Sequence, residues 1–215
     1  MKRAIPITTL FLDIGGVVLT DGWDHRARKR AATAFDLDWA EMEARHRMTF
    51  ELVEEGELAL DDYLSLVVFY QKRSFTRSRF RRFMFAQSEP YPDMIDFISG
   101  LRARHDLKVV VVSNEGRELN RHRVRTFRLD DFVDVFISSS FVHLRKPNPD
   151  IFRLALDVAQ VEASEVLYLD NTAMFVHIAE GLGIRSVLHT HFASTRTKLL
   201  AFGLQSGGGI IQKTG

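Results

Sequence analysis

The fold of this chain is decided by the stretch Thr8–Thr20, TTLFLDIGGVVLT. Leu10, Phe11 and Leu12 form a short apolar run, which predicts a strand buried on both faces. The run stops at Asp13, and two glycines soon after it break any regular element. Open α/β sheets bind their ligands beyond the carboxyl ends of such strands. Asp13 is therefore a candidate ligand-binding or catalytic residue, although a carboxylate here can also simply cap a local turn.

The composition restricts the class of protein. The chain has 215 residues, 46% of them hydrophobic, enough for one sizeable core or a core with an inserted subdomain. The 29 basic residues nearly balance the 28 acidic ones, which gives no reason to expect nucleic acid or a membrane surface as partner. Cysteine is absent, so disulfides, thiolate zinc sites and a cysteine nucleophile are excluded. With no signal-peptide pattern and no membrane-spanning run, we expect a cytoplasmic protein.

Beyond the first strand, apolar runs alternate with helical patterns. Strands are predicted at 107–112, 133–137, 166–169 and 186–189. Helices are predicted at 93–105, at 120–127, at 151–158 after Pro149 in the first helical position, and up to residue 180, closed by Gly181 and Gly183. This alternation predicts a Rossmann-like α/β fold with a doubly wound parallel sheet.

A helical segment interrupts this alternation between residues 21 and 88. Its apolar residues recur at helical spacing, and Asp61 is a plausible N-cap for a helix over 63–70. We therefore expect an α/β core of residues 1–20 and 89–205, an inserted α-helical cap of residues 21–88, and a flexible tail of residues 206–215. Trp23 and Phe50 either border a pocket from the cap or pack inside the cap.

Polar residues follow three of the predicted strands. These residues are Asp13, the pair Ser113 and Asn114, and the pair Asp170 and Asn171. A parallel sheet brings the carboxyl ends of its strands to one edge, where Lys146 arrives on a loop after a fourth strand. This set suits phosphoryl transfer, in which one carboxylate attacks phosphorus and both carboxylates hold a divalent ion. Lysine and serine would hold the phosphoryl oxygens.

The order DIGGVV, VVVVSN, KP and a buried strand ending in Asp resembles the haloacid dehalogenase-like hydrolase superfamily, over about residues 8–188. The resemblance is greatest to the branch whose helical cap follows the first motif. It implies a nucleophilic Asp13 assisted by Lys146, and a Mg²⁺ cofactor. The implied substrate contacts are Ser113, Asn114 and Gly16, and the implied ion ligands are Asp13, the Gly15 carbonyl, Asp170 and Asn171.

Two positions depart from the family pattern. Gly15 stands where most phosphatases of the superfamily have an acid that acts as general acid and base. The absence of this acid is expected to lower the rate roughly 10²–10⁴-fold for a substrate with a poor leaving group. Asn171 replaces a carboxylate that commonly holds the ion, which is expected to weaken Mg²⁺ binding. Met174 and Phe175 also stand where relatives often have Asp and Asn.

The sequence favours a Mg²⁺-dependent phosphatase of a small phosphorylated metabolite, acting through an aspartyl-phosphate intermediate. Two alternatives stay open at this point. The first is a 2-haloacid dehalogenase, in which Asp13 attacks carbon without Mg²⁺, and the second is a catalytically weakened protein that binds phosphate esters. Neither the substrate nor the oligomeric state is predicted. Four scattered histidines lack metal-ligand spacing and are predicted to be surface or packing residues: His25, His46, His122 and His143.

Overall fold

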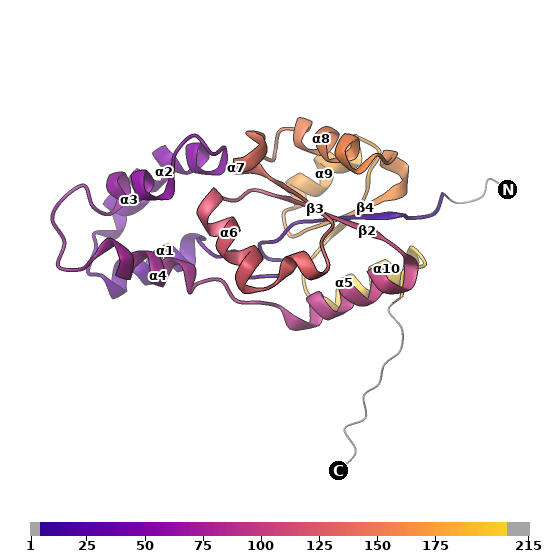
Figure 1. The fold of residues 1–215 in the computed structure, drawn as a ribbon, viewed down its shortest axis with the longest axis horizontal. Coiled ribbons are helices and arrows are strands. Elements are labelled where there is room, and N and C mark those ends of the chain that lie inside the picture. The colour runs from indigo at the N-terminus through magenta and orange to yellow at the C-terminus, as the bar shows by residue number, and fades with distance from the viewer. Residues whose placement is uncertain (1–4, 206–215) are drawn as a thin grey trace, which may run out of the picture.

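The computed structural model describes residues 5–205 and places a five-stranded parallel sheet at the centre of the α/β part (Figure 1). The strands are β1 (Thr9–Leu12), β2 (Lys108–Ser113), β3 (Val135–Ser138), β4 (Val166–Asp170) and β5 (Arg185–Leu188). Their order is β3-β2-β1-β4-β5, so the strand that precedes Asp13 lies in the middle of the sheet. The predicted Rossmann-like α/β fold is confirmed. The predicted flexible tail, 206–215, lies outside the described residues.

Helices cover both faces of the sheet. The helices of the α/β part are α5 (Pro92–His105), α6 (Arg117–Thr126), α7 (Ser139–Val142), α8 (Asp150–Ala159), α9 (Ala173–Gly181) and α10 (Phe192–Ala201), with short 3₁₀ turns at Leu129–Asp131 and Ala163–Glu165. Side chains alternate along β1, so Leu10 and Leu12 pack in the cluster that contains α5 and α10 residues, whereas Phe11 packs with α8 and α9. Because both faces are covered, the middle residues of the central strands are apolar, and the polar residues lie at the strand ends.

Four further helices pack beside the carboxyl edge of the sheet around a hydrophobic core of their own (Figure 1). These helices, called the cap helices below, are α1 (His25–Ala34), α2 (Trp39–Glu54), α3 (Leu60–Val67) and α4 (Arg77–Phe85). The two chain segments that join them to the sheet run side by side. Thr20 N donates to the Glu89 carbonyl at 2.8 Å, and Leu19 and Pro90 form a β-bridge.

Several element boundaries differ from the prediction. Helix α3 begins at Leu60 after Ala59, so Asp61 lies in the first turn instead of capping the helix. The helix ends at Val67 because Arg73 binds the freed Val68 carbonyl at 2.7 Å, and Phe69 then packs on the cap aromatics.

In the α/β part, the predicted ends shift by one to three residues. Helix α6 begins three residues earlier than predicted, and Pro149 is the N-cap of α8 instead of its first residue. Gly181 is the last residue of α9, and the positive φ of 82° belongs to Gly183 beyond it.

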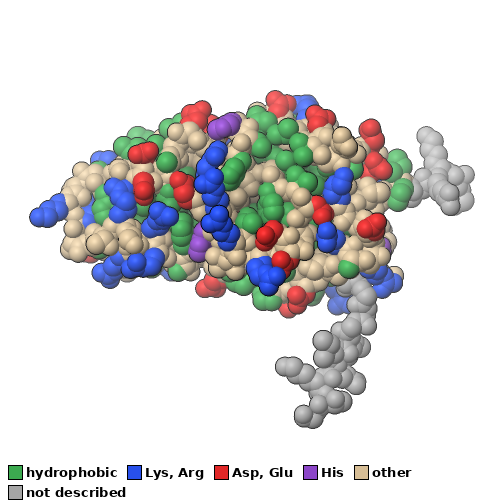
Figure 2. Space-filling view, viewed as in Figure 1, with side chains coloured by type: hydrophobic (Ala, Val, Ile, Leu, Met, Phe, Trp, Pro, Cys, Tyr) green, Lys and Arg blue, Asp and Glu red, His purple; other side chains and the backbone are tan. Residues whose placement is uncertain are grey.

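The surface carries charges of both signs. Figure 2 shows basic side chains over the end formed by the cap helices, and acidic, basic and hydrophobic side chains mixed across the rest of this face. Within residues 5–205, no helix combines the length and the apolar character needed to cross a bilayer.

Candidate active site

Asp13 lies directly after β1 at the carboxyl edge of the sheet. Its backbone N–H donates to the Leu169 carbonyl at 2.9 Å, which continues the β1–β4 pairing and sets Asp13 level with Asp170. On the other side, β2 ends at Ser113, which is buried. Parallel pairing thus brings together three residues that are far apart in the sequence, as predicted from the polar strand ends.

Lys146 joins these residues through a buried ion-pair network. Its Nζ lies 3.2 Å from Asp13 Oδ1, 2.6 Å from Asp170 Oδ2 and 3.1 Å from the Tyr168 hydroxyl, and the side chain is only 1% exposed. The Phe175 ring lies 4.9 Å from the same ammonium. The Lys146 ammonium therefore lies between two carboxylates and next to the Phe175 ring.

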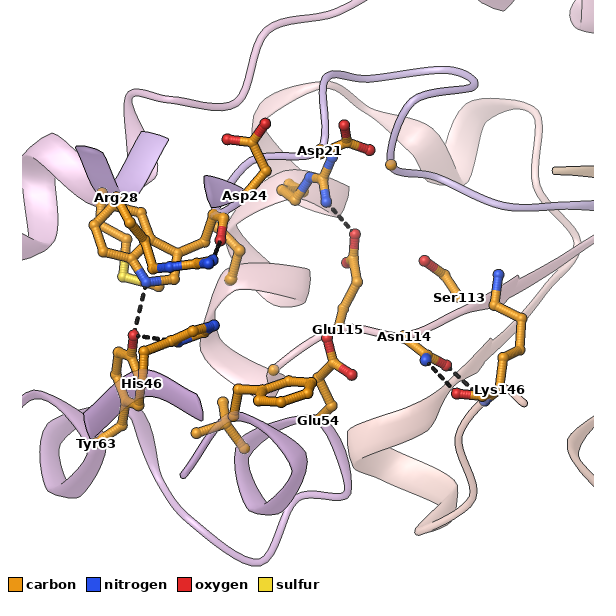
Figure 3. Close-up of a pocket in the computed structure, with 18 of the residues that line it drawn as sticks. Asp21, Asp24, Arg28, His46, Glu54, Tyr63, Ser113, Asn114, Glu115 and Lys146 are labelled. Atoms are coloured by element: carbon orange, nitrogen blue, oxygen red, sulfur yellow. Dashed lines mark hydrogen bonds and ion pairs between the residues drawn. The ribbon is translucent and has the colours of Figure 1, made fainter. Parts of the chain in front are cut away.

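Asn114 holds the backbone of Lys146. Its Oδ1 accepts from the Lys146 N–H and its Nδ2 donates to the Lys146 carbonyl, each at 2.8 Å (Figure 3). Both ends of the amide are thus engaged in positioning the loop that carries the lysine. The Asn114 side chain therefore holds the Lys146 backbone. The neighbouring Ser113 hydroxyl bonds Asp13 instead.

Electrostatics at Asp13 reflect two carboxylates sharing one lysine. Burial raises the pKa of Asp13 to about 6, with Lys146 lowering it and Asp170 raising it further. Burial also disfavours a charged Lys146, but the two carboxylates outweigh burial and raise the pKa of the lysine. With all three groups ionised, the floor of the site carries an excess negative charge, which favours binding of a cation.

The glycines after Asp13 allow a close approach to Asn171. Gly16 has a φ of 69°, and a Cβ there would overlap the Asn171 amide nitrogen. A Cβ on Gly15 would lie 3.3 Å from Asp21 Oδ1, and that same oxygen accepts from Asn171 Nδ2 at 3.4 Å. The loop after β1, Asp21 and Asn171 therefore form one contiguous wall.

The residues predicted to hold Mg²⁺ fit a hard divalent cation in their donor chemistry. Asp13, the Gly15 carbonyl and Asn171 offer oxygen donors around a site with excess negative charge, and all three residues line one cavity. Asp170 is fully buried, and its oxygens already accept from Lys146, Tyr168 and the Thr172 N–H. Among residues 5–205, no group of three or more His, Cys, Asp or Glu side chains forms a ready metal cluster.

A cavity of about 750 Å³ opens above Asp13 and is lined by both the α/β part and the cap helices. Trp23 and Phe50 both line this cavity. The sequence alone did not decide whether they border a pocket or pack inside the cap. His46 was predicted to be a surface or packing residue, but the structure places it in the cavity wall. Sequence reasoning also missed several charged or polar lining residues: Asp21, Arg28, Glu43, Arg47, Glu54, Tyr63, Glu115 and Arg123.

Part of this lining has a signal in the sequence. On α2 the cavity residues Glu43, His46, Arg47, Phe50 and Glu54 recur at helical spacing and mark one face. The spacing shows that these residues share a face, but only the packing of α2 shows that the face looks toward Asp13.

The cap helices contact the Lys146 loop directly. Arg145 pairs with Glu51 at 3.1 Å and with Glu54 at 2.9 Å, both on α2. Close by, His143 Nδ1 lies 2.7 Å from the Glu55 carbonyl oxygen. These contacts join α2 to the loop that carries Lys146, and Glu54 also lines the cavity.

Comparison with protein families supports this architecture. The model for haloacid dehalogenase-like hydrolases matches residues 7–183. This chain belongs to that family. The resemblance inferred from the four motifs is therefore confirmed, and the chain is a haloacid dehalogenase-like hydrolase.

Curated relatives of this hydrolase fall into different activity classes. It is 30% identical over 131 residues to phosphatase MT3486 of Mycobacterium tuberculosis (strain CDC 1551 / Oshkosh), a match covering 60% of this chain and 59% of that protein. It is 28% identical over 97 residues to (S)-2-haloacid dehalogenase 1 of Pseudomonas sp. (strain CBS-3), covering 45% and 42%. The matches span less than two thirds of either relative, so they leave the substrate class open.

Among solved structures, HAD family enzyme BT-2542 of Bacteroides thetaiotaomicron, in complex with magnesium and inorganic phosphate, superimposes with a TM-score of 0.70. The match covers 86% of this chain and 94% of that one at 17% identity. At this identity, the likeness shows that the fold is shared.

Proposed function

We propose that this hydrolase is a phosphatase that releases inorganic phosphate from a small phosphorylated metabolite. The observation that carries the proposal is the charge balance of the cavity. Its three buried cations are each already paired with carboxylates: Lys146 with Asp13 and Asp170, Arg28 with Glu43, and Arg123 with Glu115. The excess negative charge beside Asp13 suits a divalent cation, which in turn suits a phosphate dianion.

Asp13 supplies the nucleophile in this proposal. One carboxylate oxygen forms a bond to phosphorus as the bond to the leaving oxygen breaks, and the leaving oxygen takes a proton from water because Gly15 has none to give. Water then attacks the aspartyl-phosphate, which releases phosphate and restores the carboxylate. Lys146 and the Ser113 hydroxyl neutralise and bind the phosphoryl oxygens.

Mg²⁺ is the cofactor that we propose, held by Asp13, the Gly15 carbonyl and Asn171. When bound, it would supply positive charge to the phosphoryl oxygens. Asp170 has its oxygens occupied by Lys146, Tyr168 and the Thr172 N–H, so in the proposal its main role is to hold the lysine. Asn171 contributes a neutral amide oxygen, which is expected to give weaker Mg²⁺ binding than a carboxylate.

A 2-haloacid dehalogenase is the second candidate, favoured by the match to the Pseudomonas enzyme. In that reaction Asp13 displaces halide from carbon and no divalent ion is needed. A haloacid carries its own carboxylate, and the cavity wall already contains Asp21 and Asp24 close to Asp13 in sequence. The paired state of the buried cations argues against an additional anion binding there without a metal ion.

The test is hydrolysis of an aryl phosphate with and without Mg²⁺, for the wild type, Asp13→Asn and a control variant. The control, Asp130→Asn, makes the same chemical change at an exposed position. We expect Mg²⁺-dependent phosphate release that Asp13→Asn abolishes and Asp130→Asn retains. Chloride release from 2-chloropropionate is measured in parallel.

The possible outcomes separate the three functions. Chloride release without phosphate release would overturn the proposal in favour of the dehalogenase. If neither product forms while phosphate esters still bind to Asp13→Asn, the chain is a binding protein. Turnover of a metabolite at about 1 s⁻¹ or faster would exclude that last possibility.

A further inference from the structure

The cap side of the cavity combines an aromatic cluster with the paired charges of Arg28 and Glu43. Trp23, Phe50, Tyr63 and His46 line it, and Figure 3 shows His46 of α2 beside Tyr63. The His46 ring stacks on Phe50 with centroids 5.3 Å apart and meets the Tyr63 ring edge-on at 6.0 Å. These side chains offer flat apolar surfaces that suit the face of a ring.

The hydrogen bonds around Tyr63 assign the proton of neutral His46 to one of its two ring nitrogens. Trp23 Nε1–H can only donate, and it donates to the Tyr63 hydroxyl at 2.9 Å. Among the described residues, the Tyr63 proton has no acceptor other than His46 Nδ1, 2.9 Å away, so we assign this bond as Tyr63 donating to His46 Nδ1. Because Nδ1 is the acceptor, neutral His46 carries its proton on Nε2, which has no hydrogen-bond partner among the described residues.

Burial, reinforced by the Arg28 charge, keeps His46 neutral. Burial and then the Arg28 guanidinium lower the pKa of His46 to about 4. Arg28 is itself paired: its Nε and Nη2 donate to Glu43 at 2.9 and 2.8 Å, its Nη1 donates to the Trp23 carbonyl at 2.7 Å, and the Glu43 carboxylate balances its charge. The deep cap wall therefore presents one neutral N–H donor and no unpaired buried charge.

We propose that this wall binds the leaving group of the substrate, and that this group is an uncharged ring bearing a hydroxyl or carbonyl oxygen that accepts from His46 Nε2. The inference rests on the proposed phosphatase function and specifies the substrate class of the same site. The substrate is then a phosphate monoester of a neutral alcohol that contains a ring with an oxygen acceptor. A cavity of about 750 Å³ has room for such a molecule together with its phosphate.

A second anionic group on the substrate is the competing possibility. Arg47 also lines the cavity, but its side chain is exposed to solvent at the rim and is therefore screened. A carboxylate placed deeper would lie near the Arg28–Glu43 pair, where the Glu43 carboxylate already neutralises the arginine and would repel a second anion. The geometry therefore favours a neutral leaving group over an acidic one.

The test compares three alkyl phosphates: benzyl phosphate, hydroxymethyl-substituted benzyl phosphate and phosphoglycerate. They present a ring without an acceptor, a ring with a hydroxyl, and a carboxylate without a ring. We expect kcat/KM to be about five- to tenfold higher for the hydroxyl-bearing ring than for benzyl phosphate, mainly through KM, and lowest for phosphoglycerate.

His46 variants decide the assignment. His46→Phe keeps a ring but removes the donor, so the advantage of the hydroxyl-bearing ester should disappear, whereas His46→Gln, which keeps an N–H, should retain part of it. Met48→Gln, on the exposed side of α2, is the matched control and should keep the wild-type ratio. The ratio between two substrates is used because it is insensitive to a loss of folded protein.

The outcomes distinguish this inference from the function on which it rests. If no ester is hydrolysed with Mg²⁺ present, the phosphatase proposal fails. Hydrolysis with a preference for phosphoglycerate, or a hydroxyl advantage that survives His46→Phe, would overturn the inference while the phosphatase proposal stands.

Discussion

The neutral state of His46 predicts a pH dependence of stability that one substitution should remove. The pKa of His46 is about 4 in the folded protein, against about 6.5 in an unfolded chain. Between these values the unfolded chain binds a proton at this residue and the folded protein does not. The free energy of unfolding therefore rises with pH across this interval, and stability is lost as the pH falls.

The magnitude follows from the two pKa values. At about pH 5 the unfolded imidazole is almost fully protonated and the folded one is protonated to about a tenth. Relative to about pH 7.5, this difference removes at most about 2 kcal/mol of stability, since one pKa unit corresponds to about 1.4 kcal/mol. The two charged groups with the largest effects on the ring, Arg28 on α1 and Glu43 on α2 itself, form an ion pair with each other.

The measurement is urea unfolding of the wild type and His46→Gln at both pH values. Asp13 and Glu54, whose pKa values burial raises, contribute equally to both proteins and cancel in the difference. We expect the loss of stability on acidification to be smaller in His46→Gln by up to about 2 kcal/mol. His177→Gln, at an exposed position on α9, should behave as the wild type. Equal pH dependence in His46→Gln and wild type would refute the neutral state of the half-buried His46.

Three further substitutions test the site. Lys146→Met leaves Asp13 and Asp170 without their buried counter-charge, so we expect loss of turnover and a stability lower by about 3–5 kcal/mol in urea unfolding; unchanged stability would contradict the ion-pair network. Asn114→Ala removes both hydrogen bonds to the Lys146 backbone, so we expect the free energy of unfolding to fall by about 1–3 kcal/mol and kcat to fall as well. An unchanged kcat would show that the Asn114 amide does not position the lysine. Gly16→Ala places a Cβ against Asn171 at a positive φ, so we expect a lower melting temperature and a higher Mg²⁺ requirement in the phosphatase assay; wild-type values for both would show that the loop adapts.

Most of the α/β fold could be predicted because its signals are local. Continuous apolar runs predict buried parallel strands, and the helical patterns between them require crossovers. The observed helix ends differ from the predicted ones where tertiary contacts determine them. Helix α3 ends at Val67, before the predicted residue, because Phe69 packs on the cap aromatics and Arg73 binds the Val68 carbonyl.

The floor of the candidate site was predictable for a similar reason. Asp13, Ser113 and Asp170 each lie at or just after a strand end, and parallel pairing leaves these ends little freedom. The partners of each side chain were not predictable in this way. The Asn114 amide bonds the Lys146 backbone, and the Asp170 oxygens are occupied by three donors, because loop conformation determines which polar atoms meet.

The sequence by itself determined the sheet, the insertion of a helical segment after β1, and the residues that meet at the carboxyl edge of the sheet. Only the tertiary structure decided which cap residues share a cavity with Asp13. Helical periodicity shows that His46 and Phe50 lie on one face of α2, but the direction of that face depends on how the cap helices pack on the core. The neutral state of His46 likewise depends on Tyr63, Trp23 and Arg28, which only the folded chain brings together.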